Sequence, residues 1–135
     1  MGGVALAGVR TLGVIRDSML QLRHFPHNDF FHAHLSGLVS VLAWAQGLRD
    51  LEVAISGGPQ SRLVVDLTGL VGWLGVPERT EVGALMARHL VRMKKVALFI
   101  QREKIVGVVE AEARRNGLDL RLFSSDDEAV RWAVS

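Results

Sequence analysis

The stretch Leu63-Val64-Val65-Asp66-Leu67-Thr68-Gly69 is the most informative part of this sequence for the fold. Its first five residues form a short apolar run interrupted only by Asp66. Such a run is typical of a central strand covered on both faces of a sheet. Residues 68–80, which follow, hold three glycines and Pro77, a composition that predicts a loop. We therefore expect a buried strand over 63–67 with a loop at its carboxyl end.

Helical patterns flank this strand. Upstream, Ser40 is a suitable N-cap, and apolar residues recur every three or four positions from Val41 to Ile55. Downstream, a second apolar stripe runs over residues 82–93 and ends before another buried strand at 96–100. A third helix is predicted from about 102 to 116, because Gly117 follows it where a left-handed C-cap belongs.

The two ends of the chain complete the element order. Residues 19–25 and 30–35 alternate apolar and polar side chains around the turn at residues 26–29, which predicts a β-hairpin. Residues 118–123 read as a strand, and the capping box from Ser125 to Glu128 opens a short last helix. Strands joined through helices in this order predict an α/β sheet that is parallel apart from its hairpin.

Length and composition exclude several classes of protein. At 135 residues the chain has the size of one domain, which we place at residues 19–135, with residues 1–18 as an extension. The 16 basic and 14 acidic residues leave a net charge of +2, which does not favour nucleic-acid binding. No apolar run is long enough to span a membrane. The chain has no cysteine, which suits a reducing compartment, so we expect a cytoplasmic protein.

Residues 1–18 allow three interpretations. They form a flexible lead-in, an extra edge strand through residues 9–15, or a secretory signal peptide. The signal peptide is disfavoured because no basic region precedes the aliphatic residues, and Arg10 and Arg16 interrupt them.

Side chains capable of chemistry do not form a convincing catalytic or metal-binding set. His24, His27, His32 and His34 cluster in the hairpin, but the parity of His24 matches that of Leu22, which directs it away from His32 and His34. We therefore expect no metal site and no cofactor. Asp66 at a strand end and His89 on a helix are the best enzyme candidates, yet neither has an evident acid–base partner, and a loop-capping role for Asp66 is the simpler reading. The glycines of 69–75 match no phosphate-binding motif.

Four landmarks stand at fixed places in this order of elements. A hairpin ends at Ser36-Gly37, the central strand ends in Asp66-Leu67-Thr68-Gly69, Lys94-Lys95 precede the next strand, and the chain closes with Glu128-Ala129-Val130-Arg131-Trp132. Together with the element order, these landmarks resemble the STAS superfamily, and within it SpoIIAA-like bacterial proteins. The resemblance covers residues 19–135. It implies a mixed, mostly parallel sheet of four or five strands, helices largely on one side, and a regulatory protein without catalytic residues.

The resemblance also implies a binding site. The best-understood members, the anti-anti-sigma factors, bind a kinase-like protein partner and are switched by phosphorylation of a serine in the loop after the central strand. This sequence has no hydroxyl at Trp73-Leu74-Gly75-Val76-Pro77, where that serine belongs, which leaves Thr68 and Thr80 as candidate phosphorylation sites. We expect the loop 68–80 and the following helix to bind a protein partner, through the residues Thr68, Gly69, Trp73, Leu74, Arg79 and Thr80.

Two alternatives stay open beside this hypothesis. Related sheets can open an apolar pocket between helices and sheet, and the adaptable side chains of Trp44, Met86 and Met93 suit the lining of one, so the chain is alternatively a carrier of a small apolar ligand or lipid. Trp73 itself is either folded over the core or exposed as an anchor for a partner. A homodimer is also compatible with the sequence.

Overall fold

The computed structural model describes residues 19–135, which form five strands, four α-helices and a 3₁₀ turn. The strands are β1 (Gln21–Pro26), β2 (Phe31–Leu38), β3 (Arg62–Val71), β4 (Lys95–Phe99) and β5 (Leu120–Phe123). The helices are α2 (Val41–Ser56), α3 (Val76–Leu90), α4 (Val108–Arg115) and α5 (Asp126–Val134), and the 3₁₀ turn is η1 (Arg102–Lys104). The three interpretations of residues 1–18, including the edge strand at 9–15, lie outside the described residues.

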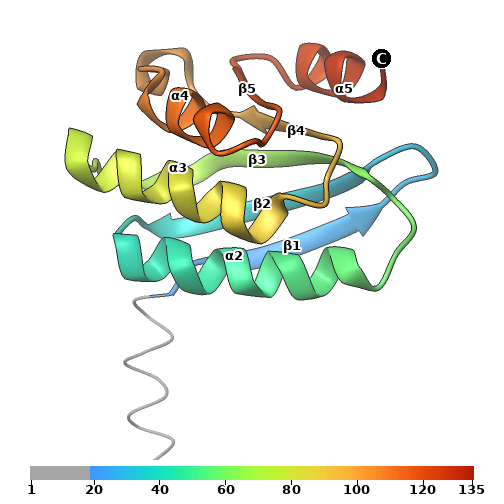
Figure 1. Ribbon diagram of the computed structural model, residues 1–135, viewed down its shortest axis with the longest axis horizontal. Coiled ribbons are helices and arrows are strands. Elements are labelled where there is room, and N and C mark those ends of the chain that lie inside the picture. The colour runs from blue at the N-terminus through green and yellow to red at the C-terminus, as the bar shows by residue number, and fades with distance from the viewer. Residues whose placement is uncertain (1–18) are drawn as a thin grey trace, which may run out of the picture.

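The strands form one sheet in the order β1-β2-β3-β4-β5 (Figure 1). β1 runs antiparallel to β2, whereas β2, β3, β4 and β5 are parallel to one another. The predicted hairpin and the predicted mostly parallel sheet are therefore confirmed. Because parallel strands end at the same edge, the carboxyl ends of β2 to β5 face the same end of the molecule.

Alternation along β3 divides the core into two layers. Leu63, Val65 and Leu67 pack into the larger cluster with α2, α3 and α4, while Val64 faces Ala129 and Ala133 of α5 on the opposite side. Three of the four described helices thus cover one face of the sheet, as expected. The core is apolar throughout: within residues 19–135 no polar or charged residue is buried.

Local capping agrees with the sequence at three helix ends. The Ser40 hydroxyl accepts a hydrogen bond from the Ala43 amide at 2.9 Å and begins α2. The Ser125 hydroxyl accepts one from the Glu128 amide at 3.3 Å and begins α5. Gly117, with a φ of 94°, has the left-handed conformation that ends α4.

The predicted loop over 68–80 is wrong, because only residues 72–75 separate β3 from α3. β3 continues through Val71 by pairing with the end of β2, where the register shifts between His34 and Ser36 so that Ser36 lies opposite Gly69. A Cβ at Gly69 would lie 2.8 Å from the Cβ of Ser36, so a glycine is required for this approach. Pro77 lies in the first turn of α3. A proline is tolerated there because backbone N–H groups of the first turn have no hydrogen-bond partner within the helix.

The predicted helix over 102–116 is also wrong in its first half. The chain forms only the short η1 turn, and α4 begins at Val108. Gly107 between them has a φ of 81°, a left-handed conformation that interrupts a right-handed helix. The interruption leaves Ile105 and Val106 in an exposed connection.

Candidate binding surface

Exposed apolar side chains gather at the carboxyl end of the parallel strands. Leu38 ends β2, and it pairs with Val71 at the end of β3. Seven of the eleven large apolar side chains exposed within residues 19–135 belong to this end, and we call them the apolar end surface: Leu38, Leu42, Val71, Trp73, Val76, Ile105 and Val106. Exposed apolar side chains concentrated at one end of a domain indicate a site that another molecule covers.

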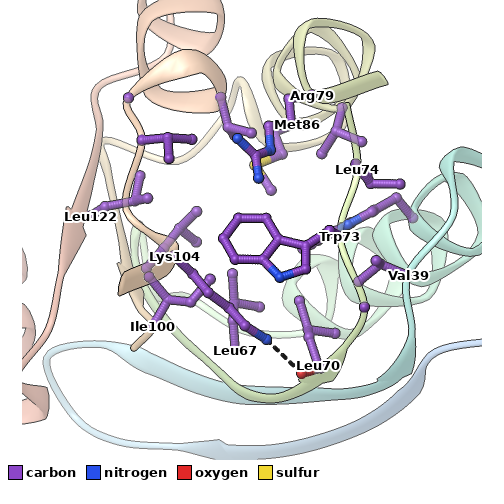
Figure 2. Close-up of a pocket in the computed structure, with 17 residues that line it drawn as sticks. Val39, Leu67, Leu70, Trp73, Leu74, Arg79, Met86, Ile100, Lys104 and Leu122 are labelled. Carbon is purple, nitrogen blue, oxygen red and sulfur yellow. Dashed lines mark hydrogen bonds between the residues drawn. The ribbon is translucent and has the colours of Figure 1, made fainter. Parts of the chain in front are cut away.

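Trp73 lies at this end, in the connection between β3 and α3. Its side chain is 60% exposed, so of the two arrangements that the sequence left open the structure has the exposed one. Gly72 before it has a φ of 100°, which turns the chain away from β3 and toward α3. Figure 2 shows the indole lying across a pocket, and the guanidinium carbon of Arg79 stands 4.9 Å from its ring centroid. This cation–π contact holds the indole at the pocket mouth.

A cavity of about 90 Å³ lies beneath the indole, between the sheet and the helices. Its walls come from the carboxyl ends of three strands and from the helices α2, α3 and α4, and they include Leu67, Leu70, Leu98, Ile100, Val82 and Val109. Of the side chains expected in such a pocket, Trp44 and Met86 line the cavity. Met93 does not line the cavity and is buried in the core instead. It comes after the carboxyl end of α3, and that end of the helix points away from the cavity.

Two cations stand at the margin of the cavity. The Lys104 ammonium donates a hydrogen bond to the carbonyl oxygen of Leu70 at 3.2 Å (Figure 2), and Arg79 covers Trp73. No carboxylate lies within 4.0 Å of either cation in the part of the chain that the structure describes. The mouth of the cavity is therefore apolar with a positive margin.

The predicted partner-binding residues divide into two groups. Trp73, Leu74 and Arg79 meet at the cavity. Thr68, Gly69 and Thr80 do not line it: Thr68 and Gly69 belong to β3, and Thr80 lies in α3. The Thr68 hydroxyl donates to Asp66 at 2.6 Å, and the Thr80 hydroxyl donates to the carbonyl of Val76 at 3.0 Å. Phosphorylation of either threonine stays a prediction.

Six members of the apolar end surface were not among the predicted binding residues, and four of the six lie outside the predicted loop 68–80. Leu38 and Leu42 lie at the end of β2 and in the first turn of α2, and Ile105 and Val106 were placed inside a helix that the structure interrupts. The sequence held one signal for this surface, since Leu42 lies off the apolar stripe of its helix. In the structure the Leu42 side chain is 75% exposed. An aliphatic side chain on the polar face of a helix is a residue that the fold itself does not require.

The two residues considered for catalysis lie on opposite faces of the sheet. Asp66 shares the α5 side with Val64, and its Oδ1 accepts a hydrogen bond from the Thr68 amide at 2.8 Å, the capping role expected for it. His89 is 2.7 Å from Glu52 and bridges α3 to α2. The structure therefore does not bring Asp66 and His89 together as an acid–base pair.

The histidines of the hairpin also separate as their parity indicates. His24 stacks on Phe31 at 5.4 Å on the face that carries α2, whereas the rings of His32 and His34 are 4.9 Å apart on the opposite face. Nδ1 of His34 lies 3.6 Å from Asp66, and Nε2 of His32 lies 3.8 Å from Asp126. Among residues 19–135, no group of three histidine, aspartate or glutamate side chains is placed to hold a metal ion.

His32 gives the fold a dependence on pH. Its Nε2 is buried without a hydrogen-bond partner, and burial lowers the pKa of His32 below its usual 6.5. Repulsion from protonated His34 lowers the pKa of His32 further, while the attraction of Asp126 opposes the shift. The unfolded chain thus binds a proton at a higher pH than the folded chain, so stability is complete above pH 6.5 and is lost as the pH falls below it.

We expect the midpoint of thermal unfolding to decrease between pH 7 and about pH 5, and to decrease less in a His32→Gln variant, because glutamine does not titrate. Calorimetry or circular dichroism at several pH values measures both curves. An equal decrease in the two proteins would show that other groups cause the effect.

No helix among the described residues has both the length and the apolar character needed to cross a membrane.

Comparisons with known proteins show what this architecture resembles. No protein-family model and no curated protein sequence matches the chain. Among solved structures, an uncharacterized protein from Shewanella loihica, of the DUF3478 family with a SpoIIAA-like fold, is 19% identical with a TM-score of 0.57, over 85% of this chain and 94% of that one. An anti-sigma factor antagonist from Mycobacterium paratuberculosis is 14% identical with a TM-score of 0.61, over 87% and 97%.

Proposed function

We propose that this chain, which has a SpoIIAA-like fold, is a non-catalytic regulatory domain that binds a protein partner through its apolar end surface. The observation that carries the proposal is the concentration of exposed apolar side chains around Trp73 at the carboxyl end of the sheet. Aromatic anchors ringed by aliphatic side chains are typical of binding hot spots. The structural neighbour from Mycobacterium paratuberculosis, described as an anti-sigma factor antagonist, supports a regulatory role exerted on another protein.

The size of the cavity favours a protein partner over a small-molecule cargo. Sites for drug-sized ligands have volumes of about 300–1,000 Å³, and an engineered cavity that holds benzene measures about 150 Å³. The cavity beside Trp73 measures only about 90 Å³, which suits a single aliphatic side chain inserted from a partner. Such insertion would add a buried contact to the exposed surface around it.

The surface that we propose differs from the one expected from the sequence. It keeps Trp73, with Leu74 and Arg79 at the cavity beside it. It gains six exposed apolar residues, Leu38, Leu42, Val71, Val76, Ile105 and Val106. Of the two candidate phosphorylation sites, Thr80 is the better one, because a phosphate on Thr68 would stand against the Asp66 carboxylate that its hydroxyl now contacts.

A matched pair of variants on α2 tests the surface. Leu42 and Val53 are 75% and 73% exposed, but Leu42 belongs to the apolar end surface, whereas Val53 lies three turns further along the helix. We expect Leu42→Asp to weaken partner binding tenfold or more, a change of about 1.4 kcal/mol, and Val53→Asp to leave it unchanged.

The measurement has two stages. Affinity capture from the source cell with the unmodified chain supplies the partner, and titration of the purified partner gives the dissociation constant for each variant. Equal affinities for Leu42→Asp and Val53→Asp would remove the apolar end surface as the binding site. Size-exclusion chromatography of the same proteins shows whether a second copy of the chain is the partner.

The apolar cavity also supports a second candidate function, the carriage of a small apolar ligand or lipid. A cargo larger than a short aliphatic group would require Trp73 to move away from the mouth. Native mass spectrometry of the purified chain distinguishes the two functions, because a carrier would retain a bound molecule of defined mass in proportion to the protein. The protein-binding proposal predicts the mass of the unliganded chain.

A further inference from the structure

The charged residues that line the cavity beneath Trp73 are both cations. They are Arg79, near the start of α3, and Lys104, at the end of η1. Both are partly buried. The acids next to them in sequence, Glu78 and Glu103, are exposed and do not line the cavity. The cavity therefore has a positive mouth that its own lining does not neutralise.

These two cations keep hydrogen-bond donors for another molecule. The Lys104 ammonium has three N–H donors, and one of them is directed at the carbonyl oxygen of Leu70. The Arg79 guanidinium has five, and its contact with the ring of Trp73 supplies no oxygen to accept them. Figure 2 shows the two cations on either side of the indole. Within residues 19–135 no carboxylate lies within 4.0 Å of either one.

A molecule that fills the cavity also removes water from these cations. Arg79 and Lys104 line the same cavity as Trp73, so a partner seated over the indole covers them as well. Burying a cation without an opposite charge is unfavourable, whereas a carboxylate placed against it forms a charge-assisted hydrogen bond. A partner surface that is only apolar would therefore bind poorly here, and acidic residues beside the inserted group would remove the penalty.

We infer that the partner presents one aliphatic side chain flanked on both sides by acidic residues. The aliphatic side chain enters the cavity, and the carboxylates bind Arg79 and Lys104. The inference rests on the proposed function, since it names the chemistry of the partner at the same surface. The planar guanidinium of Arg79 suits a two-point contact with a carboxylate, and the ammonium of Lys104 suits a single-point contact.

Three synthetic pentapeptides with blocked ends serve as probes. Each has leucine at its centre, with two acidic residues, two glutamines or two lysines on either side. Nuclear magnetic resonance follows the indole N–H signal of Trp73, which is identified by its loss in Trp73→Phe. We expect the acidic peptide to bind at least tenfold more tightly than the glutamine peptide, a difference of about 1.4 kcal/mol, and the lysine peptide to bind most weakly. Raised salt should reduce this preference.

A matched pair of double variants assigns the preference to the two cations. Arg79→Gln with Lys104→Gln changes the cavity. Arg88→Gln with Lys94→Gln removes the same charge from two exposed positions, one toward the carboxyl end of α3 and one before β4. We expect the preference to disappear in the cavity variant and to persist in the control variant. Movement of Trp73 would change the binding of the acidic and glutamine peptides alike, so the ratio of their affinities reports the charge.

Three outcomes would overturn the inference. The first is that the acidic peptide binds no better than the glutamine peptide or does not shift the Trp73 signal. The second is a preference that persists in the Arg79→Gln, Lys104→Gln variant, which would assign it to other cations. The third is tighter binding of octanoate than of the acidic peptide, which would assign the cavity to an anionic lipid instead of a protein.

The captured partner separates this inference from the proposed function. Suppose that Leu42→Asp weakens partner binding, but the cavity double variant weakens it no more than the control double variant does. The partner would then use the apolar end surface without acidic flanks, and only the inference would be refuted. Equal affinities for Leu42→Asp and Val53→Asp would instead refute the proposed function, whatever the peptides show.

Discussion

Replacing Trp44 with alanine is expected to lower the free energy of unfolding by about 3–5 kcal/mol, the cost of deleting a buried aromatic side chain. Trp44 is 5% exposed and packs in the main core between α2 and the sheet. The same change at Trp73 is expected to cost less than about 1 kcal/mol, because its side chain is 60% exposed and removing it leaves no enclosed cavity.

Chemical denaturation followed by circular dichroism measures both variants on the same scale, and it does not depend on tryptophan fluorescence. The pair is informative because the chemical change is identical and only burial differs. A loss of several kcal/mol in Trp73→Ala would assign Trp73 to the core and remove the anchor of the proposed binding site. Trp73→Ala should instead weaken partner binding, since the residue is available for contact in the free protein.

The parts of the fold that could be predicted from sequence are those determined by local pattern. Alternation over the hairpin placed Phe31 and Leu35 in the core, and a side-chain periodicity of two allows no other arrangement when one face is buried. Ser40 and Gly117 marked helix ends through the chemistry of single residues. The parallel sheet followed from the alternation of strands and helices.

The misjudged segments depend on partners that are distant in sequence. Glycine and threonine in residues 68–71 indicate a loop by composition, yet those residues form a strand because the end of β2 supplies hydrogen-bonding partners after a register shift. The helix expected over 102–116 failed at one residue, Gly107, whose left-handed φ was not evident from its neighbours. Composition indicates only the local conformational preference of a segment. The conformation of both segments instead depends on contacts with other parts of the fold.

The candidate site was predictable only in part for the same reason. Trp73 stood out as an aromatic residue flanked by Gly72 and Leu74, but the sequence left open whether it is exposed, and only the structure shows that it is. Its neighbours at the surface come from the ends of β2 and β3, the start of α2, and the connection before α4. No sequence pattern indicates that Leu42 and Val106 belong to the same end of the molecule, because that follows only from the shared edge of a parallel sheet.

The second large effect on stability is expected where α3 crosses α4. Gly83 lies in the middle of α3 and is buried, and a Cβ there would lie 2.7 Å from the carbonyl oxygen of Val109 and 2.8 Å from the Cβ of Glu112. Backbone atoms cannot rotate away as the end of a side chain does, so Gly83→Ala must displace α4. Overpacking of this kind costs about 1–3 kcal/mol, and more where the backbone has to shift.

Gly47→Ala is the matched control. Gly47 is also buried in mid-helix, but a Cβ there would meet the side chain of Leu20, with its nearest atom at 3.2 Å. Both substitutions gain about 1 kcal/mol of helix propensity, so the difference between them isolates the contact of α3 with α4. We expect denaturant titration to place Gly47→Ala near the unmodified chain and Gly83→Ala clearly below it, and equal stabilities would show that α4 yields without cost.

Gly83 also links the packing of the core to the proposed site. In Gly83→Ala, the new methyl group would press against the carbonyl oxygen of Val109. Val109 lines the cavity beneath Trp73, together with Gly107 at the start of α4. Displacement of α4 therefore moves one wall of the cavity and the adjoining Val106. Gly83→Ala should weaken partner binding as well as stability, although the substituted residue is buried and cannot contact a partner. Unchanged affinity in a destabilised Gly83→Ala protein would show that the partner uses the outer side chains, such as Leu42, and inserts nothing into the cavity.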